Sequence, residues 1–64
     1  MLAIIDNETG KFVMKFDEEN QVVVFTDDED LALKCEEQRP LMHFIKKYSG
    51  SFGLDRRYAE VVCI

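Results

Sequence analysis

The chain has 64 residues, of which 47% are hydrophobic and 33% are charged, and its formal net charge is −5. This length predicts a single domain, residues 1–64, with a core too small to enclose a small-molecule cavity of about 300 Å³ or more. The acidic balance opposes binding along a nucleic-acid backbone, and no apolar run approaches the roughly 18 residues needed to span a bilayer.

Charge is distributed unevenly along the chain. Residues 1–40 carry eleven acidic and four basic side chains, whereas residues 41–64 carry two acidic and four basic ones. This asymmetry predicts a dipolar surface that steers a basic partner toward the acidic end.

The chain contains two cysteines, Cys35 and Cys63. Secreted domains of this size usually contain several disulfides, so two thiols favour a reduced protein, with a single Cys35–Cys63 disulfide as the alternative. The apolar stretch Met1–Ile5 has no basic residue before it and is followed by Asp6, which does not match a secretory signal. We therefore expect a cytoplasmic protein.

The first two predicted elements are strands. Leu2–Ile5 is continuously apolar, which is typical of a strand covered on both faces. After a polar turn, Lys11–Phe16 alternates strictly. One predicted face carries Phe12, Met14 and Phe16, and the other carries Lys11, Val13 and Lys15. The lysines predict that this second face is exposed to water.

A second polar turn, Asp17–Asn20, leads to a third predicted strand, Gln21–Thr26, which is rich in β-branched and aromatic residues. Three strands joined by short polar turns predict an antiparallel meander. Because the third strand lies at an edge and is strongly apolar, we expect it to favour pairing with another chain.

A helical segment follows. Thr26–Glu29 matches a capping box, in which the Thr26 hydroxyl accepts a hydrogen bond from the Glu29 amide, and a short helical turn is predicted from about Asp27 to Lys34. Pro40 is tolerated only in the first turn of a helix, so a second helix is predicted over about Glu37–Tyr48, with Gly50 as its stop. Its buried stripe has helical spacing and consists of Leu41, Phe44, Ile45 and Tyr48.

Tyr58–Ile64 alternates again and predicts a fourth strand, which follows the glycine-containing connection Ser51–Asp55. We expect a right-handed crossover that places this strand beside the first one, in the sheet order 4-1-2-3. The predicted fold is therefore α+β: a small mixed, mainly antiparallel four-stranded sheet in the order β-β-β-α-β, with the helical segment packed on one face.

No motif for catalysis, a metal or a cofactor is recognisable, and we expect none of them. Asp27–Asp30 offers carboxylates, but it lacks EF-hand spacing, and capping of a helix accounts for it. A zinc site needs four ligands with one closely spaced pair, which Cys35, His43 and Cys63 do not supply. His43 also has no neighbour that would orient it as a general base, so an enzyme is the least expected class.

The residues that we expect to contact a partner are of three kinds. The first is an acidic rim consisting of Asp17, Glu18, Glu19, Asp27, Asp28 and Asp30. The second is Phe52 and Leu54, apolar side chains on a short loop that either pack onto the core or are exposed to a partner. The third is a small basic patch, formed if the loop folds back on the helix end, of Arg56 and Arg57 with Lys46 and Lys47. Stabilisation of the helix end is the alternative role for these cations.

One family resemblance is present. The stretch Val24–Asp28, an amphipathic helix ending in Phe44 and Ile45, and a terminal strand with Val61 and Cys63 resemble the layout of Dmd-type antitoxins, small acidic phage proteins that neutralise host toxins. The resemblance covers roughly the last two thirds of the chain and implies an inhibitor of a larger host protein. Because Gly50–Arg57 departs from that layout, no binding residue is transferred from the family.

The expected function is that of a small, acidic, non-enzymatic protein-binding module that antagonises a larger basic protein. Two alternatives stay open. One is a nucleic-acid-binding accessory protein that uses the small basic patch, and the other is a self-associating structural protein that dimerises through its sheet.

Overall fold

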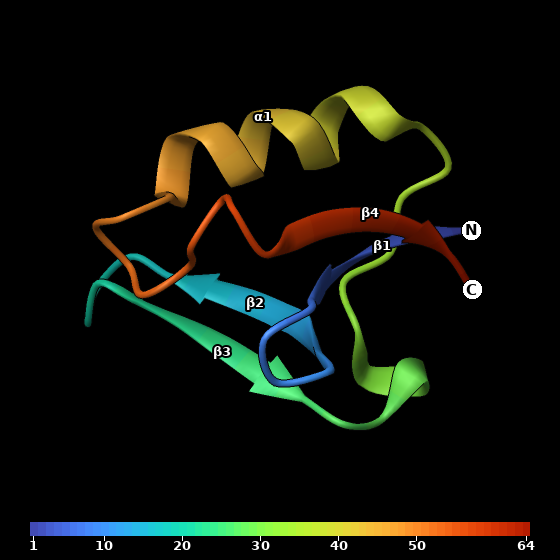
Figure 1. Cartoon of the computed structure of the whole chain (residues 1–64), viewed down its shortest axis with the longest axis horizontal. Helices are drawn as coiled ribbons and strands as arrows, with labels where there is room; N and C mark the ends of the chain where they lie inside the picture. The colour runs from blue at the N-terminus through green and yellow to red at the C-terminus, as the bar shows by residue number, and fades with distance from the viewer.

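The computed structural model describes all 64 residues and has the predicted element order β-β-β-α-β. Its elements (Figure 1) are β1 (Leu2–Asp6), β2 (Lys11–Asp17), β3 (Val22–Thr26), the 3-10 turn η1 (Glu29–Leu31), α1 (Gln38–Tyr48) and β4 (Ala59–Cys63). The sheet order is β3-β2-β1-β4, which confirms the predicted α+β class and the predicted position of the last strand beside the first.

The sheet differs from the expectation in one respect, because every pair of neighbouring strands is antiparallel and the sheet is not mixed. Figure 1 shows that α1 runs in the same direction as β1, so the chain enters β4 from the opposite end and runs back along β1. The crossover rule for parallel strands therefore does not apply to this connection.

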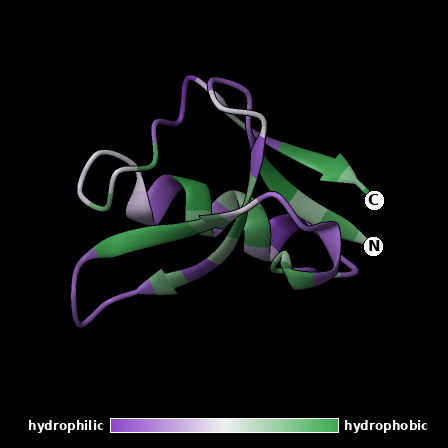
Figure 2. Cartoon of the chain, turned by 90° about the horizontal axis from the view of Figure 1, so that it is seen from below, coloured by the Kyte–Doolittle hydropathy of each residue, from purple (hydrophilic) through white to green (hydrophobic).

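The core lies between one face of the sheet and α1. It consists of six buried residues, Ile4, Val13, Val23, Leu41, Ile45 and Leu54. The helix buries Leu41, Ile45 and Tyr48, three positions of the predicted stripe, and its observed bounds agree with the predicted helix over Glu37–Tyr48. Figure 2 shows hydrophobic stretches along the strands and α1, with hydrophilic residues concentrated in the turns.

Val13 is the clearest correction to the predicted faces. We expected it on the wet face with Lys11 and Lys15, but it is fully buried in the core. The pairing of β2 with β3 shifts between Val13 and Lys15, which marks a β-bulge at this point. A bulge inserts one extra residue and reverses the alternation beyond it, so Val13 and Phe16 both reach the core.

The sheet is also split between its two central strands. Strands β1 and β2 pair only through Ile5 with Phe12 and Asp6 with Lys11. Beyond those pairs, the segment 33–35 occupies the gap. The Leu33 amide donates to the Val13 carbonyl at 2.9 Å, and Leu2 and Cys35 exchange two backbone hydrogen bonds. The connection from β3 to α1 is thereby fixed within the sheet.

The first predicted helix is the main error in secondary structure. A helical turn was predicted over Asp27–Lys34, but only Glu29–Leu31 is helical, as a single 3-10 turn. The Thr26 hydroxyl accepts from the Asp28 amide at 3.1 Å instead of from Glu29, and Asp28 caps the turn. The segment that follows is extended because its backbone groups bond to β1 and β2. No helix in the structure is long and apolar enough to cross a membrane.

Candidate functional site

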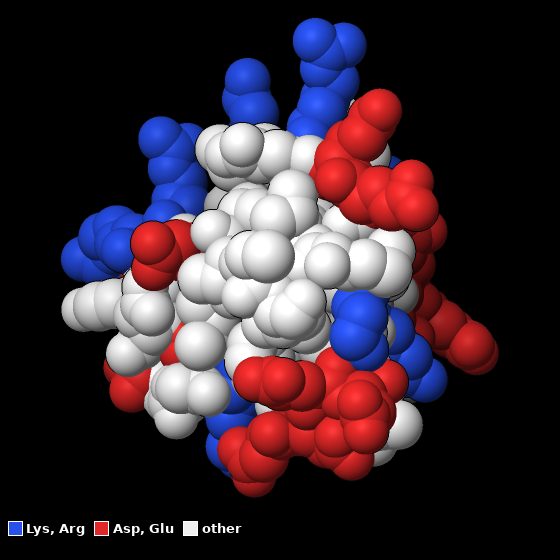
Figure 3. Space-filling view, turned by 90° about the vertical axis from the view of Figure 1, so that its right-hand side faces the viewer, with Lys and Arg blue, Asp and Glu red and all other residues white.

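The structure separates the predicted acidic rim into two groups. Asp17 ends β2, and Glu18 and Glu19 lie in the turn that leads to β3. Asp27, Asp28 and Asp30 lie beyond the other end of β3. Because β3 has five residues, the groups are about 17 Å apart along the strand. Figure 3 shows separate groups of acidic side chains around uncharged surface on the face that carries the chain ends.

Two of these carboxylates stabilise their own turns. Asp17 accepts hydrogen bonds from the backbone and side-chain amides of Asn20, at 3.1 and 2.8 Å, and these bonds hold the pKa of Asp17 below its ordinary value. Asp28 accepts from the Asp30 amide at 2.9 Å and caps η1. Turn formation therefore accounts for part of the predicted rim.

Glu18 belongs to a cluster at the end of α1. Its carboxylate accepts a hydrogen bond from the Tyr48 hydroxyl and lies 3.6 Å from the Lys47 ammonium. The bond from Tyr48, and then the charge of Lys47, lower the pKa of Glu18, and the same bond raises the pKa of Tyr48. The Tyr48 ring stacks on Phe16 at 4.3 Å between centroids.

The two apolar loop residues were expected to contact a partner or the core, and the structure separates them. Leu54 is only 1% exposed and belongs to the core, so its assignment as a partner contact is wrong. Phe52 is half-buried, and its ring lies edge-on to Tyr48 with centroids 4.8 Å apart. Burial of Leu54 anchors the loop, because an apolar side chain of this size gains roughly 1.5–3 kcal/mol from leaving water.

This anchored loop covers the outer edge of β3. The Val23 amide, which points away from β2, donates to the Phe52 carbonyl at 2.9 Å. The loop is closed by a hydrogen bond from the Gly50 amide to the Leu54 carbonyl at 2.8 Å. The edge that we expected to pair with another chain is thus partly occupied by the chain itself, with acidic residues at both ends.

The predicted basic patch is reduced to two free cations. Lys47 pairs with Glu18, and the Arg57 guanidinium pairs with Asp55 at 2.8 Å. Arg57 and Asp55 line a small polar hollow of about 330 Å³ beside the loop. The side chains of Lys46 and Arg56 are exposed and make no ion pair or hydrogen bond, and both line a larger groove elsewhere.

The outer edge of β4 is open. The ladder with β1 is bracketed by bonds from Ile64 to Met1 and from Asn7 to Tyr58. Backbone groups in an antiparallel pair point alternately inward and outward, so the even-numbered positions face β1 and the odd-numbered ones face outward. The outward Ala59 amide donates to the Asp55 carbonyl at 3.0 Å, but no hydrogen bond reaches the outward amides of Val61 and Cys63.

A groove of about 490 Å³ lies between this open edge and α1. From the helix it is lined by Gln38, Met42, Ile45 and Lys46, and from the other side by Arg56, Ala59, Glu60 and Val61. Side chains of successive strand residues point to opposite faces. A groove over one face of β4 would contact every second residue only. Because this groove contacts Ala59, Glu60 and Val61 in succession, it runs along the edge of the strand, where the backbone groups are.

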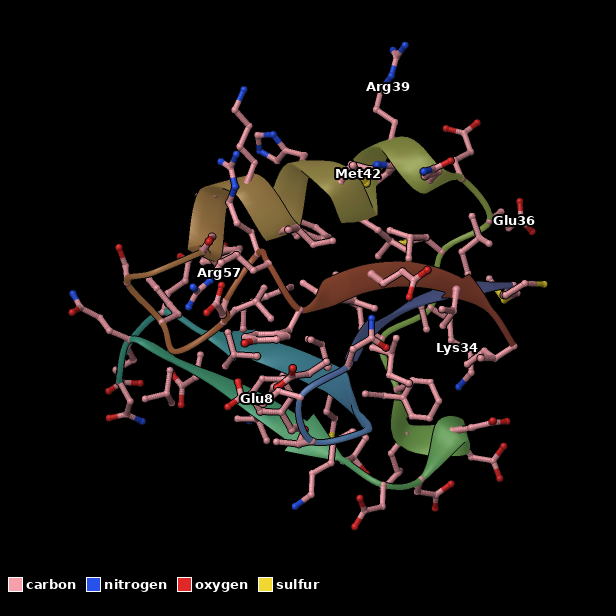
Figure 4. All side chains as sticks on the ribbon, in the orientation of Figure 1. Glu8, Lys34, Glu36, Arg39, Met42 and Arg57 are labelled. Carbon is pink, nitrogen blue, oxygen red and sulfur yellow. The ribbon has the colours of Figure 1, made fainter.

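The floor of the groove is apolar and its cations are at one end. Met42 is 50% exposed, whereas Ile45 is only 8% exposed. Figure 4 shows Arg39 projecting away from the sheet, while Met42 lies on the visible side of α1 above β4. Since α1 and β4 run in opposite directions (Figure 1), Lys46 lies toward the start of β4 and Gln38 toward its end.

The remaining polar candidates do not form a site. No group of three or more histidine, cysteine or acidic side chains is arranged to hold a metal ion. Cys35 and Cys63 are both free and pair with opposite sides of Leu2. They are therefore two strand spacings apart, roughly 9.6 Å, which is too far for a disulfide.

Of the predicted contacts, Lys46 and Arg56 of the basic patch line the β4 groove, and the sequence reasoning missed the other lining residues. Met42 carried the available signal, because it is an apolar helix residue outside the predicted buried stripe. The predicted sheet order already placed the last strand at an edge, but the alternation of Tyr58–Ile64 gave no signal that this edge stays open while the edge of β3 is covered.

Comparisons with known proteins give no relative: no family model matches the chain, and no match was found among curated proteins or solved structures. The resemblance to Dmd-type antitoxins therefore stays a prediction.

Proposed function

We propose that this chain is a small, non-enzymatic protein-binding module that takes an extended segment of another protein as a fifth strand on β4. The observation that carries the proposal is the open backbone edge of Val61 and Cys63 beside the groove. An added strand gains affinity from main-chain hydrogen bonds and specificity from the pockets beside it. An inhibitor of a larger host protein would be one instance of such a module.

The two edges of the sheet support this choice of surface. The β3 edge already bonds to Phe52, and acidic turns border both of its ends. The β4 edge has unpaired donors and an apolar groove whose half-exposed Met42 can adapt its shape to different side chains. Basic-patch binding to nucleic acid has weaker support, because two of the four expected cations are already paired with carboxylates.

The proposal is tested by selecting binders from a library of random peptides displayed on a neutral carrier and locating the selected peptides by NMR. Selected peptides should shift the amide resonances of Val61 and Cys63 and protect those amides from hydrogen exchange. The Cys63→Pro variant removes one outward donor from the edge, and it should lose binding while keeping its folded spectrum. Peptides that bind only at the acidic turns, or that ignore this variant, would overturn the proposal.

A further inference from the structure

The charges around the groove indicate which segment it accepts. Lys46 and Arg56 are exposed, line the same end of the groove and have no carboxylate partner. Glu60 also lines the groove, but its carboxylate accepts a hydrogen bond at 2.9 Å from the side-chain amide of Asn7, in the turn after β1. The end of the groove near the start of β4 is therefore locally cationic in a chain of net charge −5.

The acidic residues at the ends of β3 leave this local charge in place. Glu18 reaches the end of α1, but it is already paired with Lys47 and bonded to Tyr48. The edges of β3 and β4 are separated by three strand spacings, or roughly 14 Å. This separation exceeds the Debye length of about 8 Å at physiological ionic strength. A carboxylate placed in the groove would therefore experience Lys46 and Arg56 more strongly than the carboxylates at the ends of β3.

We infer that the segment bound at β4 is acidic at its C-terminal end and apolar in its middle. This inference rests on the proposed function. Every strand pair in the sheet is antiparallel, and an antiparallel addition is slightly more stable per residue than a parallel one. In that orientation the C-terminal end of the segment lies beside Ala59, where carboxylates meet Lys46 and Arg56.

The middle of the segment meets the apolar floor. Its residues lie beside Met42, Ile45 and Val61, and alternate side chains on the helix side of the added strand enter the groove. A single extended segment can pair with the edge of β4 beside α1, whereas a second copy of this chain would bring its own α1 along the same edge. We therefore assign the groove to a segment of another protein.

The test uses short peptides with blocked ends, so that only side chains are charged. In the parent peptide Val, Ile and Glu follow one another at alternate positions with Thr between them, and Glu is nearest the C-terminus. Matched peptides carry Gln or Lys in place of Glu, and a fourth has the reversed sequence. The Glu peptide should bind about tenfold more tightly than the Gln peptide, and the Lys peptide should bind least, as measured by fluorescence anisotropy.

Two charge-reversed variants separate local charge from net charge. Lys46→Glu with Arg56→Glu should abolish the preference for Glu over Gln. Lys11→Glu with Arg39→Glu changes the net charge equally at exposed positions outside the groove, and it should keep the preference. Equal loss in both variants would overturn the inference, because net charge alone would then explain it. A preference for the Lys peptide or for the reversed peptide would also overturn it.

Failure of the inference and failure of the proposed function give different results. If Glu, Gln and Lys peptides bind equally and Cys63→Pro abolishes all binding, the proposed strand addition is supported and the inferred preference for an acidic segment is overturned. If no peptide binds and the Val61 and Cys63 amides do not shift, the proposed function itself falls. Tighter binding of a short single-stranded oligonucleotide would show that the groove binds nucleic acid and not a protein segment. A dimer in light scattering that Cys63→Pro dissociates would show that a second copy of this chain occupies the edge of β4.

Discussion

The two edges of the sheet are built from similar strands, but the edge of β3 is covered by another segment of the chain and the edge of β4 is open. Both β3 and β4 have five residues and are rich in valine. The loop 50–54 covers β3 because Leu54 is buried and Phe52 packs on Tyr48. At β4 the neighbouring element is α1, which lies beside the edge without bonding to it. Strand sequence alone therefore does not decide which edge of a small sheet stays open.

The largest expected effect is at the covered edge. Leu54→Ala should destabilise the fold by about 2–5 kcal/mol, because it leaves a cavity in the core and releases the loop from β3. Urea unfolding measures this loss. Leu31→Ala is the matched control, since Leu31 is 56% exposed, and it should change stability by no more than about 0.5 kcal/mol. Equal effects at both positions would contradict the anchoring role of Leu54.

A proline pair tests the direction of the backbone groups in β4. Val62→Pro removes an amide that faces β1 and leaves a ladder carbonyl unpaired, which should cost roughly 1–3 kcal/mol. Cys63→Pro removes an amide that faces outward, so its cost should stay within about 0.5 kcal/mol. Urea unfolding curves of the two variants give the comparison. The reverse order of stabilities would show that the Cys63 amide, and not the Val62 amide, faces β1.

Met42 tests the groove without disturbing the core. Met42→Ala should weaken peptide binding about fivefold, because it removes apolar surface from the groove floor, and should leave stability nearly unchanged. Titration with the parent peptide measures the first effect and urea unfolding the second. His43→Ala, on the next residue of α1 and outside the groove, should leave binding unchanged. An equal loss in both variants would argue against the groove.

The smallest expected effect is the pH dependence of the cluster behind the β3 edge. The pKa of Glu18 is lowered below its ordinary 4.5 and that of Tyr48 is raised above its ordinary 10.0. The contribution of Glu18 is therefore present above about pH 4.5 and lost as pH falls through its lowered pKa, and that of Tyr48 is present below about pH 10 and lost above it.

Glu18→Gln should reduce the loss of stability on acidification, as measured by thermal unfolding across the acidic range. Asp17 and Asp55 also have lowered pKa values, so part of the acid sensitivity should persist in this variant. Glu8→Gln is the matched control, because the Glu8 carboxylate makes no hydrogen bond or ion pair. If the stability of Glu18→Gln falls with acidification as steeply as that of the unchanged chain, Glu18 does not contribute to the acid sensitivity.

The residue pattern determined the α+β class, four strands, the main helix and the order of the sheet. Period-two alternation and the stripe of Leu41, Ile45 and Tyr48 are local signals, and local signals specify elements and their buried faces. The same pattern failed at Val13, where a bulge reversed the alternation, and over Asp27–Lys34, where bonds to β1 and β2 replaced helical ones.

Only the tertiary structure decided that an open strand edge and a groove lie side by side. The acidic residues are exposed on any fold, but the groove exists because α1 lies beside an edge strand whose outward amides no other segment reaches. Backbone hydrogen bonding between distant segments is set by how the chain packs, because every amide and carbonyl is chemically alike along the sequence. The open edge of β4 and the isolation of Lys46 and Arg56 from carboxylates are properties of that packing.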